Sequence, residues 1–205
     1  IMVQQYDYLV IGSGIAGMSF ALKVAGRNSR VALVCKSALE EANTYLAQGG
    51  VASVTNLAVD NFEKHINDTM IAGDWLSDGA AVKKVVRDAP EQIQFLIDHG
   101  VCFDKNENGD FDLHREGGHS EFRILHHADN TGAEIQTSLV EQVRSNPYID
   151  IYDHHLAVEI ITQHHLGRTV TRRSKDITCY GAYILDEDHD TIDTFLARVT
   201  LMATR

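Results

Sequence analysis

The sequence has few of the features that mark several common protein classes. It contains only two prolines and three widely spaced cysteines, Cys35, Cys102 and Cys179. A scattered, odd number of cysteines is not a disulfide framework, so we expect a reducing, cytoplasmic setting. No run of about 18 apolar residues occurs, and the N-terminus has no charged segment followed by an apolar one. We therefore expect neither a membrane span nor a signal peptide.

Positive charge is also scarce. The 205 residues include 18 Lys and Arg against 29 Asp and Glu, which gives a formal net charge of −11. Sequence-independent binding of nucleic acid depends on Lys and Arg that neutralise phosphates, so we expect no nucleic-acid partner. The hydrophobic share of 44% is ordinary for a globular domain, so a folded core is expected.

The N-terminal segments predict an α/β fold that opens with a β-α-β unit. Residues 6–11 and 31–34 are short apolar runs typical of buried strands. Between them, Ile15, Met18 and Leu22 recur at helical spacing, and residues 26–28 close that helix. This order favours a parallel sheet with helices packed on it.

The middle of the sequence predicts helices and turns. We expect helices near residues 60–72 and 78–99, the second split at Pro90 because proline lacks an N–H and disfavours a helical residue before it. Residues 105–110 predict a turn, and residues 51–54 predict a strand. Thr131 and Glu134 fit a capping box at the start of a further helix.

Beyond Pro147 the pattern changes to strands. A strand is expected at residues 149–152, followed by an antiparallel meander at 157–162, 177–185 and 191–197 and by a separate buried strand at 198–203. The sequence ends two residues after that last strand. We therefore expect the whole of 1–205 to be the N-terminal segment of a domain that is incomplete at its C-terminus.

The motif GSGIAG at residues 12–17 lies between a predicted strand and a predicted helix. In that context it predicts a dinucleotide-binding loop rather than a ligand-free turn. Gly12 permits the tight turn, Gly14 lets the backbone approach a pyrophosphate, and Gly17 lets the helix pack close to the strand. Free N–H groups and the positive end of the helix dipole then hold the phosphate charge.

One part of the dinucleotide fingerprint is missing. An Asp or Glu about 20 residues further on usually binds a ribose hydroxyl. Here the second strand is followed by Cys35 and Lys36, and Glu40 and Glu41 come later. This argues against ordinary NAD binding. It leaves Lys36 as either a cationic contact to the cofactor or an ordinary exposed lysine.

Two more loops are candidates for ligand binding. The segment NTYLAQGG at residues 43–50 ends in two glycines, which allow a backbone to lie against a flat ring system, although an ordinary Gly-Gly turn fits as well. The segment REGGHSE at residues 115–121 gathers a cation, carboxylates, an imidazole and a hydroxyl in one glycine loop. That density is typical of a ligand site, but a solvated loop has the same composition.

Taken in order, these segments resemble the succinate dehydrogenase, fumarate reductase and L-aspartate oxidase flavoprotein family. The resemblance covers nearly the whole chain. The phrases NTYLAQGGVA, HREGGHSEFRILHHADNTGAE and GVCFD are most similar to the L-aspartate oxidase branch. The resemblance implies FAD as cofactor and a Rossmann-like, glutathione-reductase-like FAD-binding domain, with a parallel sheet, helices and an antiparallel β-meander.

The resemblance also implies roles for individual residues. The pyrophosphate would meet residues 13–16, Lys36 would contact FAD near its adenosine end, Ala157 and Val158 would lie near the adenine, and residues 43–50 would line the flavin. Glu116 would orient the amino group of aspartate. The implied cofactor contacts are Gly12, Ser13, Gly14, Ile15, Ala16, Gly17, Lys36, Asn43, Thr44, Tyr45, Leu46, Ala47, Gln48, Gly49, Gly50, Ala157 and Val158.

Two positions separate the branches of the family. Where the covalent flavoproteins have a histidine, this sequence has Asn43, which implies non-covalent FAD. The dicarboxylate branches have an uncharged residue where Glu116 stands, and a carboxylate there suits an ammonium group. Arg205 replaces a family glycine. The capping and helical domains, the catalytic arginine and the substrate-binding histidines lie further on in the family, so no catalytic residue is expected in this chain.

The expected reaction of the full-length protein is oxidation of L-aspartate to iminoaspartate. FAD is reoxidised by oxygen or fumarate, the product enters quinolinate and NAD synthesis, and quinolinate synthase is a candidate partner. The alternatives are a succinate dehydrogenase or fumarate reductase-type flavoprotein and a non-catalytic nucleotide-binding fragment. Eleven histidines, several in adjacent pairs, also suggest metal binding. Adjacent residues in a strand point to opposite faces, so we expect no metal site.

Overall fold

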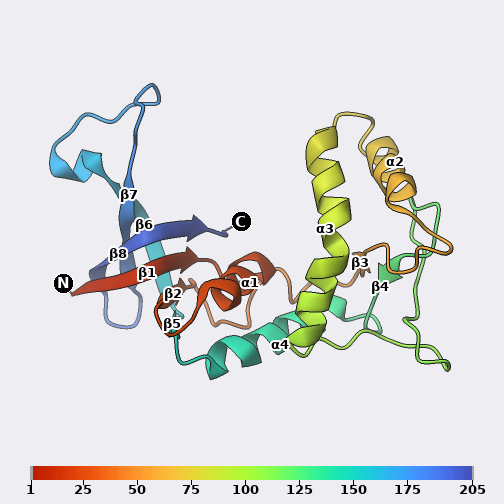
Figure 1. Ribbon diagram of the computed structural model, residues 1–205. Coiled ribbons are helices and arrows are strands. Elements are labelled where there is room, and N and C mark those ends of the chain that lie inside the picture. The colour runs from red at the N-terminus through yellow and green to blue at the C-terminus, as the bar shows by residue number, and fades with distance from the viewer. Residues whose placement is uncertain (1, 205) are drawn as a thin grey trace. The chain divides into compact units, whose positions relative to one another are not determined.

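The computed structural model describes residues 2–204 (Figure 1), so Arg205 lies outside the described residues. The chain divides into two compact units. Unit 1 comprises Ile1–Thr44 and Leu139–Arg205, and unit 2 comprises Tyr45–Ser138. The division falls within helix α4 (Thr131–Ser145).

Unit 1 contains the predicted β-α-β start. Strand β1 (Val3–Ile11) pairs in parallel with β2 (Val31–Val34), and β2 pairs in parallel with β5 (Ile149–Tyr152). Helix α1 (Ile15–Val24) connects β1 to β2. The four residues of β2 are all buried, which fits a strand covered on both faces.

A meander completes the six-stranded sheet of unit 1. Strands β6 (His155–Thr162), β7 (Cys179–Asp186) and β8 (Thr191–Met202) pair antiparallel, and a short 3-10 helix, η1 (Gln163–Leu166), follows β6. The strand order is β5-β2-β1-β8-β7-β6. In Figure 1, β8 runs between β1 and β7, parallel to the first and antiparallel to the second. The parallel sheet and the antiparallel meander therefore share one strand.

The two faces of β1 and β2 have different coverings. On one face, Leu9, Ile11, Ala32 and Val34 form a core cluster with Ala182, Ile184 and Phe195 of the meander. The intervening residues point to the opposite face. There Val10 lies beside Gly17, so α1 packs on that side. This layering confirms the predicted α/β arrangement of helices, parallel strands and meander.

Unit 2 is built around two helices and a small sheet. Helix α2 (Phe62–Ala72) begins at Asn61, whose side chain accepts from the Lys64 N–H, and α3 (Gly79–Asp98) begins at Asp78, which accepts from two N–H groups. Strands β3 (Val51–Ala52) and β4 (Ile124–Leu125) pair antiparallel. The turn predicted at residues 105–110 is present, with Gly109 at φ +84°.

The predicted break at Pro90 is wrong. Helix α3 runs through Pro90 without interruption. Proline inside a helix costs about 3 kcal/mol. The helix buries Val86, Ile93 and Leu96 on one face, and each such side chain contributes roughly 1.5–3 kcal/mol when buried. Burial of the continuous apolar face therefore outweighs the local penalty.

The predicted separation of residues 191–197 from 198–203 is also wrong. Both segments belong to β8, whose register with β1 continues from Thr194 to Met202. Nor is the second half fully buried, since Val199 is 45% exposed and Met202 is 62% exposed. Continuous pairing with the long strand β1 keeps the segment extended without a turn.

The predicted capping box is replaced by other contacts. The Thr131 hydroxyl accepts from the backbone N–H of His127, and the Glu134 carboxylate accepts from the backbone N–H of Cys102 at 2.9 Å. Thr131 is itself the first residue of α4. Both side chains therefore fasten neighbouring segments to the helix instead of satisfying its own first N–H groups.

Candidate functional site

The glycine loop joins β1 to α1 in unit 1. Gly12 has φ +117°, which L side chains rarely adopt, and its N–H donates to the Val34 carbonyl at 2.8 Å. A Cβ on Gly17 would collide with the carbonyl oxygen of Gly12. The structure thus gives both glycines the roles predicted for them, the turn and the close helix packing.

Gly14 is different because neither its backbone conformation nor its packing within the protein requires a glycine. Its φ is −74°, open to any residue, and an added Cβ would meet only Thr44 Oγ1, at 3.4 Å. Thr44 Oγ1 also accepts from the Ile15 N–H at 3.0 Å, while Gly14 offers no side-chain cap to α1. The open space above a helix N-terminus fits an anionic ligand.

The end of β2 lies at the same edge of the sheet as the glycine loop. Lys36 follows β2 there and is exposed. The backbone N–H of His155 donates to the Cys35 carbonyl at 2.9 Å, which fixes the start of β6 beside Lys36. The β6–β7 register shifts between Ala157 and Glu159, so Val158 is a bulge outside the paired positions. Its backbone groups therefore suit a ligand near this edge.

Cys35 is a structural thiol rather than a reactive one. Burial raises its pKa to about 11, although a hydrogen bond with Ser13 acts in the opposite direction. At neutral pH the thiol stays protonated and is a poor nucleophile. Its side chain thus contacts Ser13 of the glycine loop and is not expected to react.

The segment predicted to line the flavin is mostly exposed. Asn43 and Thr44 end the first part of unit 1, and residues 45–50 begin unit 2. A Cβ on Gly50 would collide with Leu125 of β4, so this glycine has a packing role within unit 2. A Cβ on Gly49 would lie 3.9 Å from Glu116 Oε1. Unit 2 therefore brings the double glycine and the predicted substrate carboxylate together.

The loop that holds Glu116 is closed at its base by a bridge between His114 and Ile124. Within it, the His119 N–H donates to the Glu116 carbonyl at 3.2 Å, and Gly118 has φ +87°. The Arg115 guanidinium lies 5.5 Å from the centre of the Phe122 ring. The glycine-rich segment is thus a short, internally bonded loop.

A buried ionic network anchors this loop. Arg123 is completely buried and donates twice to Asp60, each bond 2.8 Å, and once to Asp68 at 2.6 Å. Asp68 also accepts from the N–H and hydroxyl of Ser120 at 2.8 and 2.7 Å. A further contact of 3.2 Å joins Arg123 to the His119 ring. The charges satisfy one another and hold the far side of the loop against α2.

Electrostatics keep the network ionised. Burial raises the pKa values of Asp60 and Asp68, but hydrogen bonds and the charge of Arg123 outweigh it, so both lie below the usual 3.8. Burial, followed by the positive charge of Arg123, lowers the pKa of nearby His65. His65 is therefore neutral at neutral pH while both aspartates are charged.

The sequence interpretation missed this network. Its one available signal was Arg123, a lone cation inside the apolar run of Phe122, Ile124 and Leu125. Such a residue is rarely fully buried unless it is paired. Its acidic partners lie more than 50 residues earlier in the sequence, so their identity depends on the fold.

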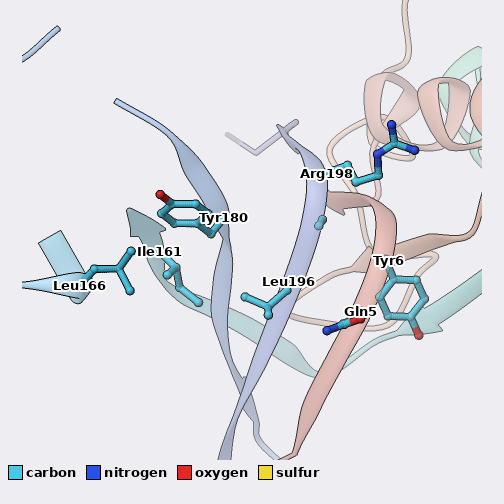
Figure 2. Close-up of a pocket in the computed structure, with 8 residues that line it drawn as sticks. Gln5, Tyr6, Ile161, Leu166, Tyr180, Leu196 and Arg198 are labelled. Carbon is cyan, nitrogen blue, oxygen red and sulfur yellow. The ribbon is translucent and has the colours of Figure 1, made fainter. Parts of the chain in front are cut away.

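A shallow apolar groove lies elsewhere in unit 1, on the sheet. Figure 2 shows Leu196 of β8 between Tyr180 on one side and Gln5 on the other. Its lining includes none of the predicted cofactor residues. The groove is therefore separate from the candidate site. Among residues 2–204, no helix is long and apolar enough to cross a membrane.

Comparison with known families matches residues 7–205 to the family described as FAD binding domain. The chain belongs to this FAD-binding family. Because the family match covers the glycine loop, the β-α-β unit and the meander, FAD is the cofactor of the domain. The predicted Rossmann-like FAD-binding fold and its flavoprotein family are thereby confirmed.

Individual relatives agree with this assignment. The chain is 40% identical to L-aspartate oxidase 2-b of Nicotiana tabacum, covering 99% of this chain and 30% of the relative. It is 42% identical to L-aspartate oxidase of Pseudomonas aeruginosa, covering 98% of this chain and 37% of the relative. The chain thus spans about a third of the length of these curated relatives.

Solved structures show the same fold. A quinol fumarate reductase of E. coli is 27% identical with a TM-score of 0.87, covering 100% of this chain and 33% of that one. Sdh1 of Mycobacterium smegmatis is 26% identical with a TM-score of 0.85, covering 100% and 34%. The FAD-binding chain therefore resembles flavoprotein oxidoreductases in sequence and in structure.

Proposed function

We propose that the whole protein oxidises L-aspartate to iminoaspartate. One observation carries the proposal: Glu116 Oε1 lies beside Gly49, in the loop expected to line the flavin. Support comes also from the L-aspartate oxidases, which are about 40% identical to this chain. FAD, when bound, supplies the acceptor for the hydride removed from the substrate.

Residues of this chain would hold the cofactor in four places. The loop from Gly12 to Gly17 would bind the pyrophosphate, where Gly14 leaves open space above α1. Lys36 would contact the adenosine end, and Ala157 with the bulged Val158 would lie along the adenine. Residues 43–50 would line the flavin. Asn43 has no nucleophilic atom to form a flavin bond, so we propose that FAD is non-covalent.

Glu116 would select the substrate by charge. A carboxylate attracts the ammonium group of aspartate and gains nothing from succinate, which lacks one. Asp68 binds Ser120 and Arg123, and these bonds fix the backbone of the loop. The exposed Glu116 side chain is therefore positioned by the loop that carries it. The loop would thus orient the amino group toward the reacting face.

The wider setting follows from the same proposal. Oxygen or fumarate would reoxidise the flavin, and iminoaspartate would enter quinolinate and NAD synthesis, with quinolinate synthase as the candidate partner. A cytoplasmic location is part of the proposal. It is supported by Cys35, Cys102 and Cys179, which are all free thiols in the described structure.

A second candidate is an oxidoreductase of the dicarboxylate branch. The structural similarity to fumarate reductase favours it, whereas the charge of Glu116 opposes it. A non-catalytic nucleotide-binding role is the remaining alternative. The three are distinguished by adding aspartate or succinate to the complete protein without oxygen. Bleaching of the flavin by aspartate supports the proposal, bleaching only by succinate supports the second candidate, and no bleaching supports the third.

Replacing Glu116 with Gln should weaken discrimination between aspartate and succinate in the complete protein. Losing a charge-assisted contact to ammonium is expected to raise the KM for aspartate by about 10- to 100-fold. Steady-state kinetics with both substrates would measure it. The control is Glu107→Gln, an exposed change in the turn at residues 105–110, which should leave KM unaltered. An unchanged substrate ratio in Glu116→Gln would remove this residue from the substrate site.

A further inference from the structure

Unit 2 contains a cluster of metal-binding side chains at the base of the Glu116 loop. Asp112, His114 and His126 each present a ligand atom, and these three atoms lie within 4.8 Å of one another. Asp112 and His114 are exposed, whereas His126 is buried. Asp112 and His114 are two residues apart in the segment between the isolated bridges at Phe111 and His114.

The buried ring of His126 independently points to a ligand at this cluster. Its side chain is only 9% exposed, yet neither ring nitrogen has a hydrogen-bond partner. A buried polar atom without a partner destabilises the fold, so such atoms usually serve a purpose. The His126 Nε2 lies 3.8 Å from Asp112 Oδ2, too far for a hydrogen bond. A cation bound between His126 Nε2 and Asp112 Oδ2 would give each of these atoms a partner.

A carboxylate lies close to the other ring nitrogen of His126, although the two do not form a hydrogen bond. Its other nitrogen, Nδ1, lies 3.3 Å from Asp104 Oδ2. Histidines that bind metals through one nitrogen commonly donate from the other to a carboxylate, which fixes the ring. Asp104 is therefore placed to orient His126 from one side while Nε2 lies 3.8 Å from Asp112 Oδ2 on the other.

His114 completes the set from the opposite side of the loop. Its ring is stacked on that of His126, with centroids 3.6 Å apart and planes at 21°. Since His114 is exposed, its ring can tilt about the side-chain bonds to aim a lone pair at a shared ion. The backbone bridge between His114 and Ile124 keeps both imidazoles at the loop base.

We propose that Asp112, His114 and His126 bind a divalent transition metal of the Zn²⁺ class. Two imidazoles and one carboxylate are ligands that Zn²⁺ accepts, and a water molecule would occupy its fourth position. Such an ion would link the two strands at the base of the loop that holds Glu116. This departs from the sequence expectation of no metal site, which considered only histidines adjacent in sequence.

Titration of the whole chain with ZnCl₂ in a calorimeter, after removal of metals by a chelator, tests the site. We expect one Zn²⁺ per chain, bound more weakly as the pH falls because protons compete for the imidazoles. Changes to residues behind the ligands already weaken metal sites by about 10- to 100-fold. His114→Ala and Asp112→Asn should therefore each weaken binding by at least about 10-fold.

Both variants alter exposed side chains and leave the buried His126 itself in place, although His114→Ala removes the ring stacked on it. The matched control is His189→Ala, which removes an exposed histidine of unit 1 that pairs with Asp186. It should bind Zn²⁺ like the unaltered chain. If the chain binds no Zn²⁺, or if His114→Ala and Asp112→Asn bind it as tightly as the unaltered chain, the assignment is wrong. Loss of binding only in the His189 variant would also overturn it.

Discussion

Replacing Arg123 with Met should destabilise unit 2 by about 3–5 kcal/mol, since removing one partner of a buried ion pair leaves an uncompensated charge. Arg123 is fully buried and its three donors serve Asp60 and Asp68. Methionine preserves much of the volume, so the loss reports charge pairing rather than a cavity. Denaturant unfolding followed by circular dichroism would measure it.

The matched control is Arg87→Met on α3. Arg87 pairs with Glu63 at 2.9 Å, but both side chains are more than half exposed. Exposed pairs contribute about 0–1 kcal/mol, so this variant should unfold almost like the unaltered chain. Equal stability of the Arg123 and Arg87 variants would contradict the anchoring role assigned to the buried network.

The effect of Arg123→Met should depend on pH. In the unaltered chain the pKa values of Asp60 and Asp68 are lowered. Their ionised forms therefore stabilise the fold above the unfolded value, and this contribution is lost as pH falls through the folded values. Without Arg123 both pKa values should rise, because only the hydrogen bonds from Asn61 and Ser120 then oppose the effect of burial. The stability difference between the two proteins should therefore shrink from about pH 7 toward about pH 3.

Replacing Gly14 with Ala should lower FAD affinity by about 100-fold or more while the chain stays folded, because a methyl group enters space needed by the pyrophosphate. The protein itself tolerates the change, since the added Cβ meets only Thr44 Oγ1, at 3.4 Å. Titration with FAD, followed by flavin fluorescence, would measure affinity, and circular dichroism would report the fold.

Gly17→Ala provides the contrast. Its added Cβ would collide with the Gly12 carbonyl, so α1 must shift from β1, at a cost of about 1–3 kcal/mol. This variant should lose both stability and FAD. If Gly14→Ala bound FAD normally, the pyrophosphate would have to lie elsewhere. If it unfolded as Gly17→Ala does, the space above α1 would be a packing feature.

Local patterns were sufficient to predict much of the fold. The strands at β1 and β2, the turn at Gly12 and the meander depend on short apolar runs and on glycine stereochemistry, which the sequence displays directly. The errors arose where distant parts of the chain compete with local preference. Pro90 stays helical because α3 buries one continuous apolar face, and β8 stays unbroken because β1 pairs along its length.

The candidate site likewise contains residues that the sequence predicts and residues that only the fold identifies. Gly12, Gly17 and the Glu116 loop are recognisable from residue type and order. The partners of Arg123 and the cluster of Asp112, His114 and His126 are not. Each of these sets depends on which segments the fold brings side by side, and no spacing in the sequence specifies that.

The central claim is that this chain belongs to a protein that binds FAD without a covalent bond. The most direct measurement is the absorption spectrum of the purified protein incubated with FAD, before and after acid precipitation. A flavin band that moves into the acid supernatant is the expected result. Absence of any bound flavin, or a flavin band that remains with the precipitated protein, would contradict it.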